Sequence, residues 1–164
     1  DFTSRIGEIR EGFRATVDGP YGRFSYLNFP WEKSIFLIVG GVGITPALGM
    51  IRYMHSQDRS RHVTLVWGLN NRHEMISHDE IKQIQQDMPY FRMIPVMFKD
   101  EEWEGERGVI DQILLARIIE RHGHDIKHTG FYVCGPLPMM KAVIPALKAI
   151  GVKRRKIHYE KFSL

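Results

Sequence analysis

The chain has 164 residues, with 23 Lys and Arg against 19 Asp and Glu for a formal net charge of +4, and 43% of its residues are hydrophobic. This length supplies one hydrophobic core, and no apolar run approaches the roughly 20 residues that a membrane-spanning helix needs. The single cysteine, Cys134, excludes an internal disulfide framework and is typical of a reducing compartment, so we expect a cytoplasmic protein or the cytoplasmic domain of a membrane protein.

The first 30 residues differ from the rest of the chain. A short amphipathic segment at 3–10 is followed by a strand-like run at 13–17 that has no partner strand nearby. A lone strand is marginally stable. We therefore interpret residues 1–30 as the end of a neighbouring β-rich domain with its linker, and residues 31–164 as a complete domain.

From Ser34 onward, strand-like and helical patterns alternate. Five apolar runs predict strands at 35–39, 62–68, 91–98, 130–134 and 156–160. Helices are expected between them, at 46–57, 77–88, 111–123 and 136–150, with Ser77 and Glu80 forming a capping box and Asp111 an N-cap. This alternation predicts an α/β fold, a doubly wound five-stranded parallel sheet with helices on both faces.

A glycine-rich turn follows the first strand. Gly40, Gly41 and Gly43 allow backbone angles and close approaches that a Cβ atom would forbid, and Thr45 and Pro46 are predicted as N-cap and first helical residue. Such a turn with a helix N-terminus favours a dinucleotide pyrophosphate. Proline replaces the third glycine of the common G-x-G-x-x-G fingerprint, so a tight β–α connection without a ligand stays an alternative.

Residues that follow the strands should gather at one rim of the sheet, where doubly wound folds bind ligands. Besides the glycine turn, these residues are G-L-N-N-R at 68–72, K-D-E at 99–101 and C-G-P at 134–136. Their polar and small character predicts a binding site at that rim.

Four segments stand out when taken together: D-G-P-Y-G-R-F at 18–24, G-G-V-G-I-T-P at 40–46, C-G-P-L-P-M-M at 134–140 and H-Y-E-K-F at 158–162. In this order and at these separations they resemble the ferredoxin–NADP reductase-like flavoreductases. The segments D-F-T-S at 1–4 and W-E-G-E-R-G at 103–108 are similar to the ferric reductase and NADPH-oxidase-like branch.

The resemblance implies the NAD(P)H-binding module of a flavin-dependent oxidoreductase. In that family a β-barrel domain binds FAD, and a second domain binds NAD(P)H so that hydride passes to the flavin and electrons move on singly to ferric iron, haem or an iron–sulfur centre. This chain resembles the second domain with the last strand of the first. The implied partners are therefore an FAD-binding domain of the same polypeptide, a downstream acceptor and a fused membrane domain, and the chain alone should not turn over.

The resemblance also assigns roles to individual residues. Those expected at the transfer site are Cys134, Glu160 and Phe162. Those expected to bind cofactor are Gly40, Gly41, Gly43, Ile44, Thr45, Pro46, Arg72, Gly135, Pro136, Met139, Thr3 and Ser4. Alternatives stay open: Cys134 as a buried strand residue, Glu160 and Phe162 as parts of an ordinary last strand, and Arg72 as a surface arginine.

The choice between NADH and NADPH depends on the group at the 2′ position of the ribose. A 2′-phosphate favours arginine or lysine, whereas a free hydroxyl tolerates acidic neighbours. Five acidic residues follow the third predicted strand, at 100–102, 104 and 106, so the sequence favours NADH. Arg72 would favour NADPH. Two other functions remain: a nucleotide-sensing module without turnover, and a self-contained NAD(P)-dependent dehydrogenase.

Two polar clusters, one basic and one of histidines, are interpreted as solvated surface. The basic run at 153–156 lacks any zinc-finger or RNA-binding signature, so we expect no nucleic-acid partner, although an anionic membrane surface could attract it. His122, His124 and His128 follow a predicted helix end at Gly123. We expect a solvated loop there and no metal site.

Overall fold

The computed structural model describes residues 3–16, 18–19 and 22–161, and the side chain of Thr3 is not described. The strands are β1 (Ser34–Gly40), β2 (His62–Leu69), β3 (Phe91–Met97), β4 (Glu106–Arg107), β5 (Thr129–Gly135) and β6 (Ile157–Lys161). The helices are α1 (Ile44–Gln57), α2 (His78–Asp87), α3 (Gln112–Arg121) and α4 (Leu137–Ala149).

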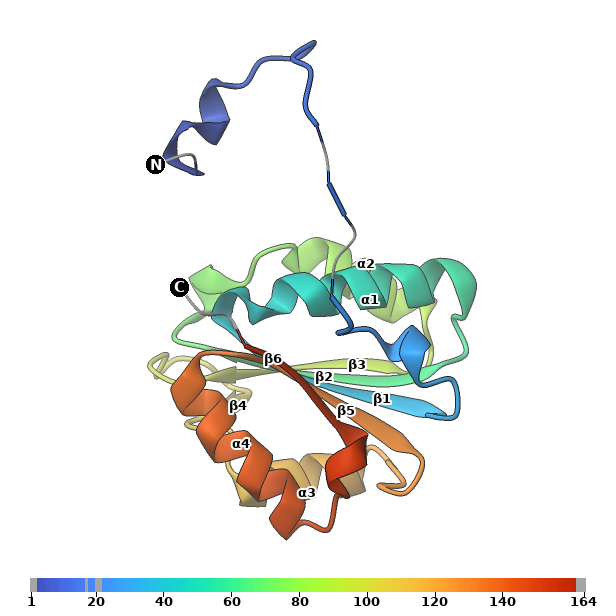
Figure 1. The fold of residues 1–164 in the computed structure, drawn as a ribbon. Coiled ribbons are helices and arrows are strands. Elements are labelled where there is room, and N and C mark those ends of the chain that lie inside the picture. Colours follow the sequence, from blue (N-terminus) through green and yellow to red (C-terminus); the bar gives the residue numbers. More distant parts are fainter. Residues whose placement is uncertain (1–2, 17, 20–21, 162–164) are drawn as a thin grey trace.

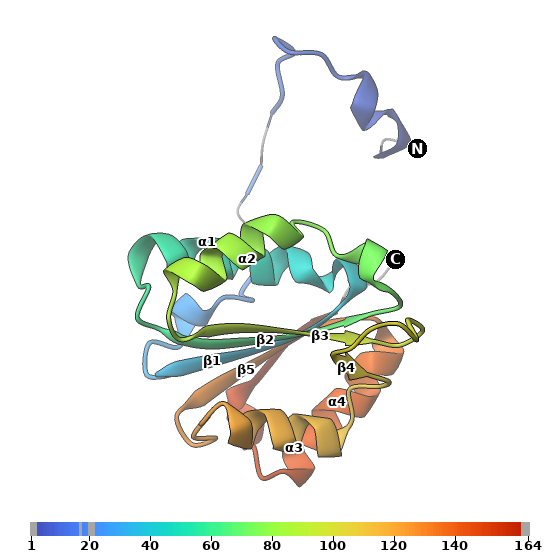
Figure 2. The same cartoon turned by 180° about the vertical axis from the view of Figure 1, so that it is seen from behind.

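All strand pairs are parallel, in the order β4-β3-β2-β1-β5-β6. Helices α1 and α2 cover one face of the sheet, and α3 and α4 cover the other (Figures 1 and 2). The predicted doubly wound α/β fold is therefore confirmed. The sheet has six strands and not five because the two residues of β4 pair with Val96 and Met97, and two residues are too short to show a periodic pattern.

The sheet separates two hydrophobic clusters. All seven residues of β1 are buried, as expected of a strand covered on both faces. Side chains of β1 alternate between the clusters: Leu37 and Val39 pack toward α1 and α2, whereas Phe36 and Ile38 pack toward α3 and α4. At about 1.5–3 kcal/mol for each fully buried large apolar side chain, this burial is the main force that holds the layers together.

Two predicted helix caps are wrong. Helix α1 begins at Ile44, and the hydroxyl of Thr45 donates to the carbonyl oxygen of Val42 at 3.0 Å instead of capping the helix. Ser77 has a left-handed backbone (φ 52°) and no side-chain cap bond, and Glu80 forms a bidentate ion pair with Arg52 of α1. The predicted cap of α3 is confirmed: Oδ1 of Asp111 accepts from the backbone N–H of Leu114 at 2.8 Å.

The N-terminal segment of residues 3–16 extends away from the α/β layers (Figure 1). Residues Thr3–Glu8 form a 3₁₀ helix, but residues 13–16 have no regular structure, so the predicted strand is not formed by the described part of 13–17. A strand requires a neighbouring strand for its backbone hydrogen bonds, and the sheet lies elsewhere. Val17, Pro20 and Tyr21 lie outside the described residues.

Two residues that were predicted to lie in solvated loops are buried. His124 is 7% exposed, with its Nε2 2.7 Å from the hydroxyl of Thr64 and its ring stacked on His62. Lys156 is also 7% exposed, and its ammonium lies 3.6 Å from a carboxylate oxygen of Glu32. Both predictions failed because the partners come from distant parts of the chain.

Among residues 3–16, 18–19 and 22–161, no helix is long and apolar enough to cross a membrane. Within the same described ranges, no group of three or more His, Cys, Asp or Glu side chains could hold a metal ion.

The buried His124 predicts a stability that depends on pH. Burial lowers the pKa of His124 to about 3, and the pKa values of His62 and His122 are also lowered, chiefly by burial. When the pH falls below about 6.5, the ordinary pKa of histidine, His124 binds a proton in the unfolded chain but stays neutral in the folded chain. The free energy of unfolding should therefore fall by up to about 1.4 kcal/mol per pH unit for this residue as the pH drops from about 6.5 toward 3.

Urea unfolding followed between pH 7.5 and 5 measures this slope. His124→Gln keeps an amide nitrogen near the Thr64 hydroxyl but cannot titrate in this range, so its slope should be shallower than that of the unaltered chain. Equal slopes would show that His124 is not the group responsible.

Candidate functional site

The ends of β1 and β5 lie side by side at the point where the chain reverses its direction across the sheet, and a pocket of about 440 Å³ opens there. Its lining comes from the segments that follow β1, β2, β3, β4 and β5: Gly40, Gly41, Gly68, Leu69, Asn70, Glu74, Val96, Phe98, Gly108, Val109, Ile110, Pro136, Pro138, Met139 and Ala142. The predicted rim therefore exists, as the crevice at a topological switch point requires.

Close packing at this rim requires three glycines. A Cβ atom on Gly43 would overlap the carbonyl oxygen of Cys134 and lie 2.7 Å from its carbonyl carbon. A Cβ on Gly40 would lie 2.7 Å from the sulfur of Met139, and one on Gly135 would lie 2.9 Å from the backbone nitrogen of Gly40. The start of α1 and the ends of β1 and β5 can therefore approach one another closely.

Gly41 has a different role. Its backbone is left-handed (φ 50°), and a Cβ atom there would meet nothing within 4 Å. Its carbonyl oxygen accepts from the indole N–H of the buried Trp67 at 3.2 Å, which fixes the turn against β2. The turn thus has open space beside Gly41, which lines the pocket.

These features fit a dinucleotide pyrophosphate. The start of α1 carries the positive end of the helix dipole. The N–H of Ile44 already donates to the carbonyl oxygens of Gly41 and Val42, and Pro46 has no N–H, so the dipole and the open glycine turn are what this end of α1 offers a phosphate. The pocket is lined mainly by apolar and small residues, which suits flat rings beside a phosphate cradle. Ile44 is buried at the start of α1, whereas Thr45 is exposed.

Cys134 and Glu160 lie opposite each other on neighbouring strands in the β5–β6 register. The thiol is fully buried, and burial, with a smaller effect of the Glu160 charge, raises its pKa to about 11. A protonated, buried thiol is a poor nucleophile. Glu160 and Pro46 line a second hollow of about 520 Å³ between α1 and residues 22–28.

Arg72 lies next to the rim but outside the lining of the first pocket. Its guanidinium forms two bonds of 2.7 Å with the carboxylate of Asp100 and lies 3.6 Å from Glu102. The hydrogen bond from Arg72 holds the pKa of Asp100 well below its usual value. Arg72 is therefore already paired with two of the acidic residues that follow β3.

The pocket is lined by four of the twelve predicted cofactor residues. Gly40, Gly41, Pro136 and Met139 line the pocket, whereas Thr3 and Ser4 lie on the N-terminal segment. Phe162 lies outside the described residues.

Sequence reasoning expected Asn70 at the rim but missed other pocket residues, among them Glu74, Phe98 and Ile110. Glu74 accepts two hydrogen bonds from Asn70, at 3.0 and 2.9 Å. These residues follow strands, and that position is the signal that could have identified them.

Residues 37–144 match the model of a family described as oxidoreductase NAD-binding domain. A glycine betaine monooxygenase reductase subunit of Chromohalobacter salexigens is 30% identical over 159 residues, covering 94% of this chain and 42% of its own length. A flavohemoprotein of Bacillus thuringiensis is 34% identical over 161 residues, covering 94% and 39%.

Solved structures show the same fold. The flavohem-like FAD/NAD-binding domain of a nitric oxide dioxygenase from Vibrio cholerae aligns with a TM-score of 0.75 at 29% identity, covering 87% of this chain and 56% of that one. The chain spans less than half the length of the two relatives named above.

The glycine contacts predict very different costs for two neighbouring substitutions. Gly43→Ala should separate α1 from the end of β5, because its methyl group overlaps the backbone of Cys134. Gly41→Ala has room for the methyl group and pays only for the left-handed backbone, about 1 kcal/mol. Urea unfolding should show a loss at least about 2 kcal/mol larger for Gly43→Ala. Similar losses for both variants would contradict the described packing.

Proposed function

The chain belongs to the oxidoreductase NAD-binding domain family, and on that premise we propose that it is the NAD(P)H-binding module of a flavin-dependent reductase. The observation that carries the proposal is the pocket at the switch point, which the glycine turn and Pro136 line, with Gly43 beside it packed against the carbonyl group of Cys134. Bound there, NAD(P)H would supply a hydride to a flavin held by a neighbouring domain.

The residues of this chain would bind and position the nucleotide. Gly41 and the N-terminus of α1 would hold the pyrophosphate. Gly135, Pro136 and Met139 would shape the wall beside the end of β5, and Cys134 and Glu160 would support the transfer site from the two neighbouring strands. None of these groups needs to accept or donate a proton, because the cofactors carry the redox chemistry.

The N-terminal segment supports a partner domain. Ile6, Ile9 and Phe13 are 52%, 54% and 71% exposed, although apolar side chains at such close spacing are normally covered. We propose that residues 1–30 belong to an FAD-binding barrel of the same polypeptide, with Thr3 and Ser4 near the FAD and Phe162 near the flavin. The acceptor that follows would be ferric iron, haem or an iron–sulfur centre, in a cytoplasmic setting.

We propose NADH as the preferred nucleotide. A 2′-phosphate requires a cationic side chain that is available to it. The guanidinium of Arg72 is already bound by Asp100 and Glu102. These acidic residues therefore occupy the arginine and would also repel the 2′-phosphate of NADPH.

Calorimetric titration of the chain with NADH, NADPH and FAD tests the proposal. We expect NADH to bind more tightly than NADPH and FAD to bind weakly. Asp100→Ala should free Arg72 and shift the ratio of the two nucleotide Kd values toward NADPH by about fivefold, or about 1 kcal/mol. Asp125→Ala removes the same charge before β5, where Asp125 pairs with His128, and should leave the ratio unchanged. Tight FAD binding without any pyridine-nucleotide binding would overturn the proposal.

A second test concerns Cys134 in the longer polypeptide that carries the proposed FAD-binding domain, loaded with FAD. Cys134→Leu enlarges a fully buried side chain beside the rim and should slow flavin reduction about tenfold, because it misplaces the reacting rings and removes no group that contacts the phosphates. The nucleotide Kd should change by no more than about twofold. Cys134→Ala serves as the control for size. Rapid-mixing rates that are equal for Cys134→Leu and the unaltered protein would instead favour a module that senses nucleotide without turnover.

A further inference from the structure

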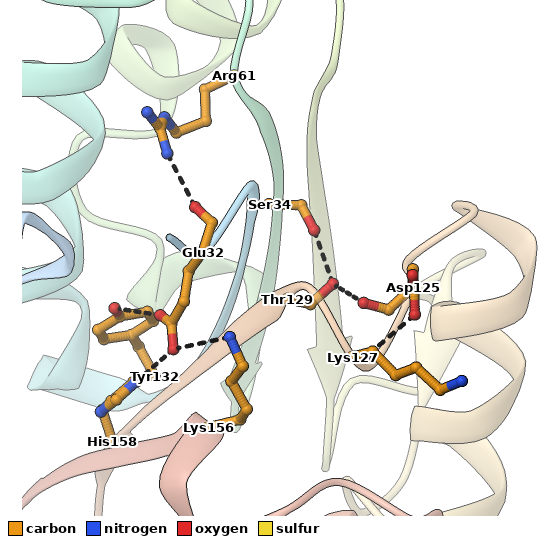
Figure 3. Close-up of polar contacts among 9 residues, drawn as sticks. All are labelled: Glu32, Ser34, Arg61, Asp125, Lys127, Thr129, Tyr132, Lys156 and His158. Atoms are coloured by element: carbon orange, nitrogen blue, oxygen red, sulfur yellow. Dashed lines mark hydrogen bonds and ion pairs between the residues drawn. The ribbon is translucent and has the colours of Figure 1, made fainter. Parts of the chain in front are cut away.

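A buried carboxylate lies on the α1 side of the sheet, just before β1. The side chain of Glu32 is 0% exposed, and its Oε2 accepts a hydrogen bond of 2.7 Å from the hydroxyl of Tyr132. Its Oε1 lies 2.9 Å from Nε2 of His158 and 3.6 Å from the ammonium of Lys156. Figure 3 shows these three partners converging on one carboxyl group.

The chain around Glu32 is shaped for this arrangement. A Cβ atom on Gly130 would overlap the Oε2 atom of Glu32, so the carboxylate fits only because residue 130 is glycine. Nη1 of Arg61 donates to the backbone carbonyl of Glu32 at 3.1 Å, and the ring of Phe29 stacks on His158 at 3.8 Å. Burial and the hydrogen bond to Glu32 also raise the pKa of Tyr132, which keeps its hydroxyl a donor.

Burying a carboxylate is costly unless it is paired and hydrogen-bonded. Glu32 satisfies that condition with two hydrogen-bonding partners, Tyr132 and His158, and one ion pair, with Lys156. Two of these three groups come from β6 or the residue before it. Strand β6 lies at the edge of the sheet, and within the described part of the chain it pairs only with β5. The carboxylate therefore adds a side-chain attachment between β5 and an edge strand that is otherwise held on one side.

The register places this attachment next to the transfer site. Tyr132 pairs with His158, and two residues further along the strands Cys134 pairs with Glu160. Residues two apart in a strand point to the same face. Glu32 therefore bridges the cross-strand pair that directly precedes Cys134 and Glu160 on their own face of the sheet.

We propose that Glu32 is a positioning residue for hydride transfer: by holding Tyr132 and His158 together, its carboxylate fixes the β5–β6 register that places Glu160 beside Cys134. The proposal rests on the proposed function, because it assigns the transfer site to these two residues. Glu32 lies before the amino end of β1, whereas the transfer site lies at the carboxyl ends of the strands. Glu32 would therefore support the site from the other end of the sheet.

The test compares Glu32→Gln with a matched control. The amide keeps the size of the side chain but removes its charge and one acceptor oxygen, which leaves Lys156 and one of the two hydrogen-bonding partners unsatisfied. Thr129→Val is the control. It removes a buried hydroxyl that lies 2.6 Å from the hydroxyl of Ser34 and donates to Asp125, on β5 before the first residue that pairs with β6. Figure 3 shows both groups.

Two quantities are measured. Hydrogen exchange of the backbone amides of 157–161 is followed in the 164-residue chain, and we expect at least tenfold faster exchange for Glu32→Gln and no change for Thr129→Val. Flavin reduction at saturating NADH is followed in the longer polypeptide that carries the proposed FAD-binding domain, loaded with FAD. There we expect a rate about tenfold lower for Glu32→Gln, with the NADH Kd within about twofold, and an unchanged rate for Thr129→Val.

The outcomes separate the two proposals. If the unaltered protein reduces flavin and Glu32→Gln does so at the same rate, the positioning role is wrong and the proposed function stands. The same conclusion follows if the control slows the reaction equally, because a general loss of stability then explains both. If the unaltered protein binds NADH but transfers no hydride, the proposed function fails and the positioning role fails with it. Should Glu32→Gln not fold, Tyr132→Phe removes a single hydrogen bond and must show the same pattern at smaller size.

Discussion

The candidate site depends on the contact between Gly43 and the carbonyl group of Cys134. Because residue 43 has no side chain, the first turn of α1 lies directly against the end of β5. The ends of β1 and β5 can then share one crevice, which Gly40 and Gly41 line on one side and Pro136 and Met139 on the other. A doubly wound sheet provides a crevice at this point by topology, and the glycines decide that it is tight enough to shape a binding surface.

Charged groups near the site are arranged in pairs, and the pairs have different functions. Arg72 and Asp100 are partly exposed and bind each other through two parallel hydrogen bonds, so they define the charge at one end of the rim. Glu32 is fully buried, and its three partners link the segment before β1 to the edge strand. The exposed pair can exchange partners with a ligand, whereas the buried carboxylate would leave unpaired groups if it moved.

The chain belongs to the oxidoreductase NAD-binding domain family and has the fold of a related FAD/NAD-binding domain, and both agree with a nucleotide-binding site at the rim of the sheet. The relatives are reductase components and flavohemoproteins that are more than twice as long as the aligned part, so the flavin and the acceptor enter as proposals for the whole polypeptide. The exposed apolar residues of the N-terminal segment are the feature of this chain that most directly favours a neighbouring domain.

The sequence by itself determined the alternation of strands and helices, the α/β class, the glycine turn after β1 and the family, because these follow from local periodicity, from glycine and from short ordered motifs. It also placed the residues after each strand at one rim. It could not show β4, which is two residues long. It also predicted a capping box of Ser77 and Glu80, whereas in the structure Ser77 makes no cap bond and Glu80 pairs with Arg52. Only the tertiary structure decided that Lys156 and His124 are buried, that Arg72 is already paired, and that Glu32 contacts residues 100 and 126 positions away. Such contacts depend on which strands become neighbours, and no local pattern of residues carries that information.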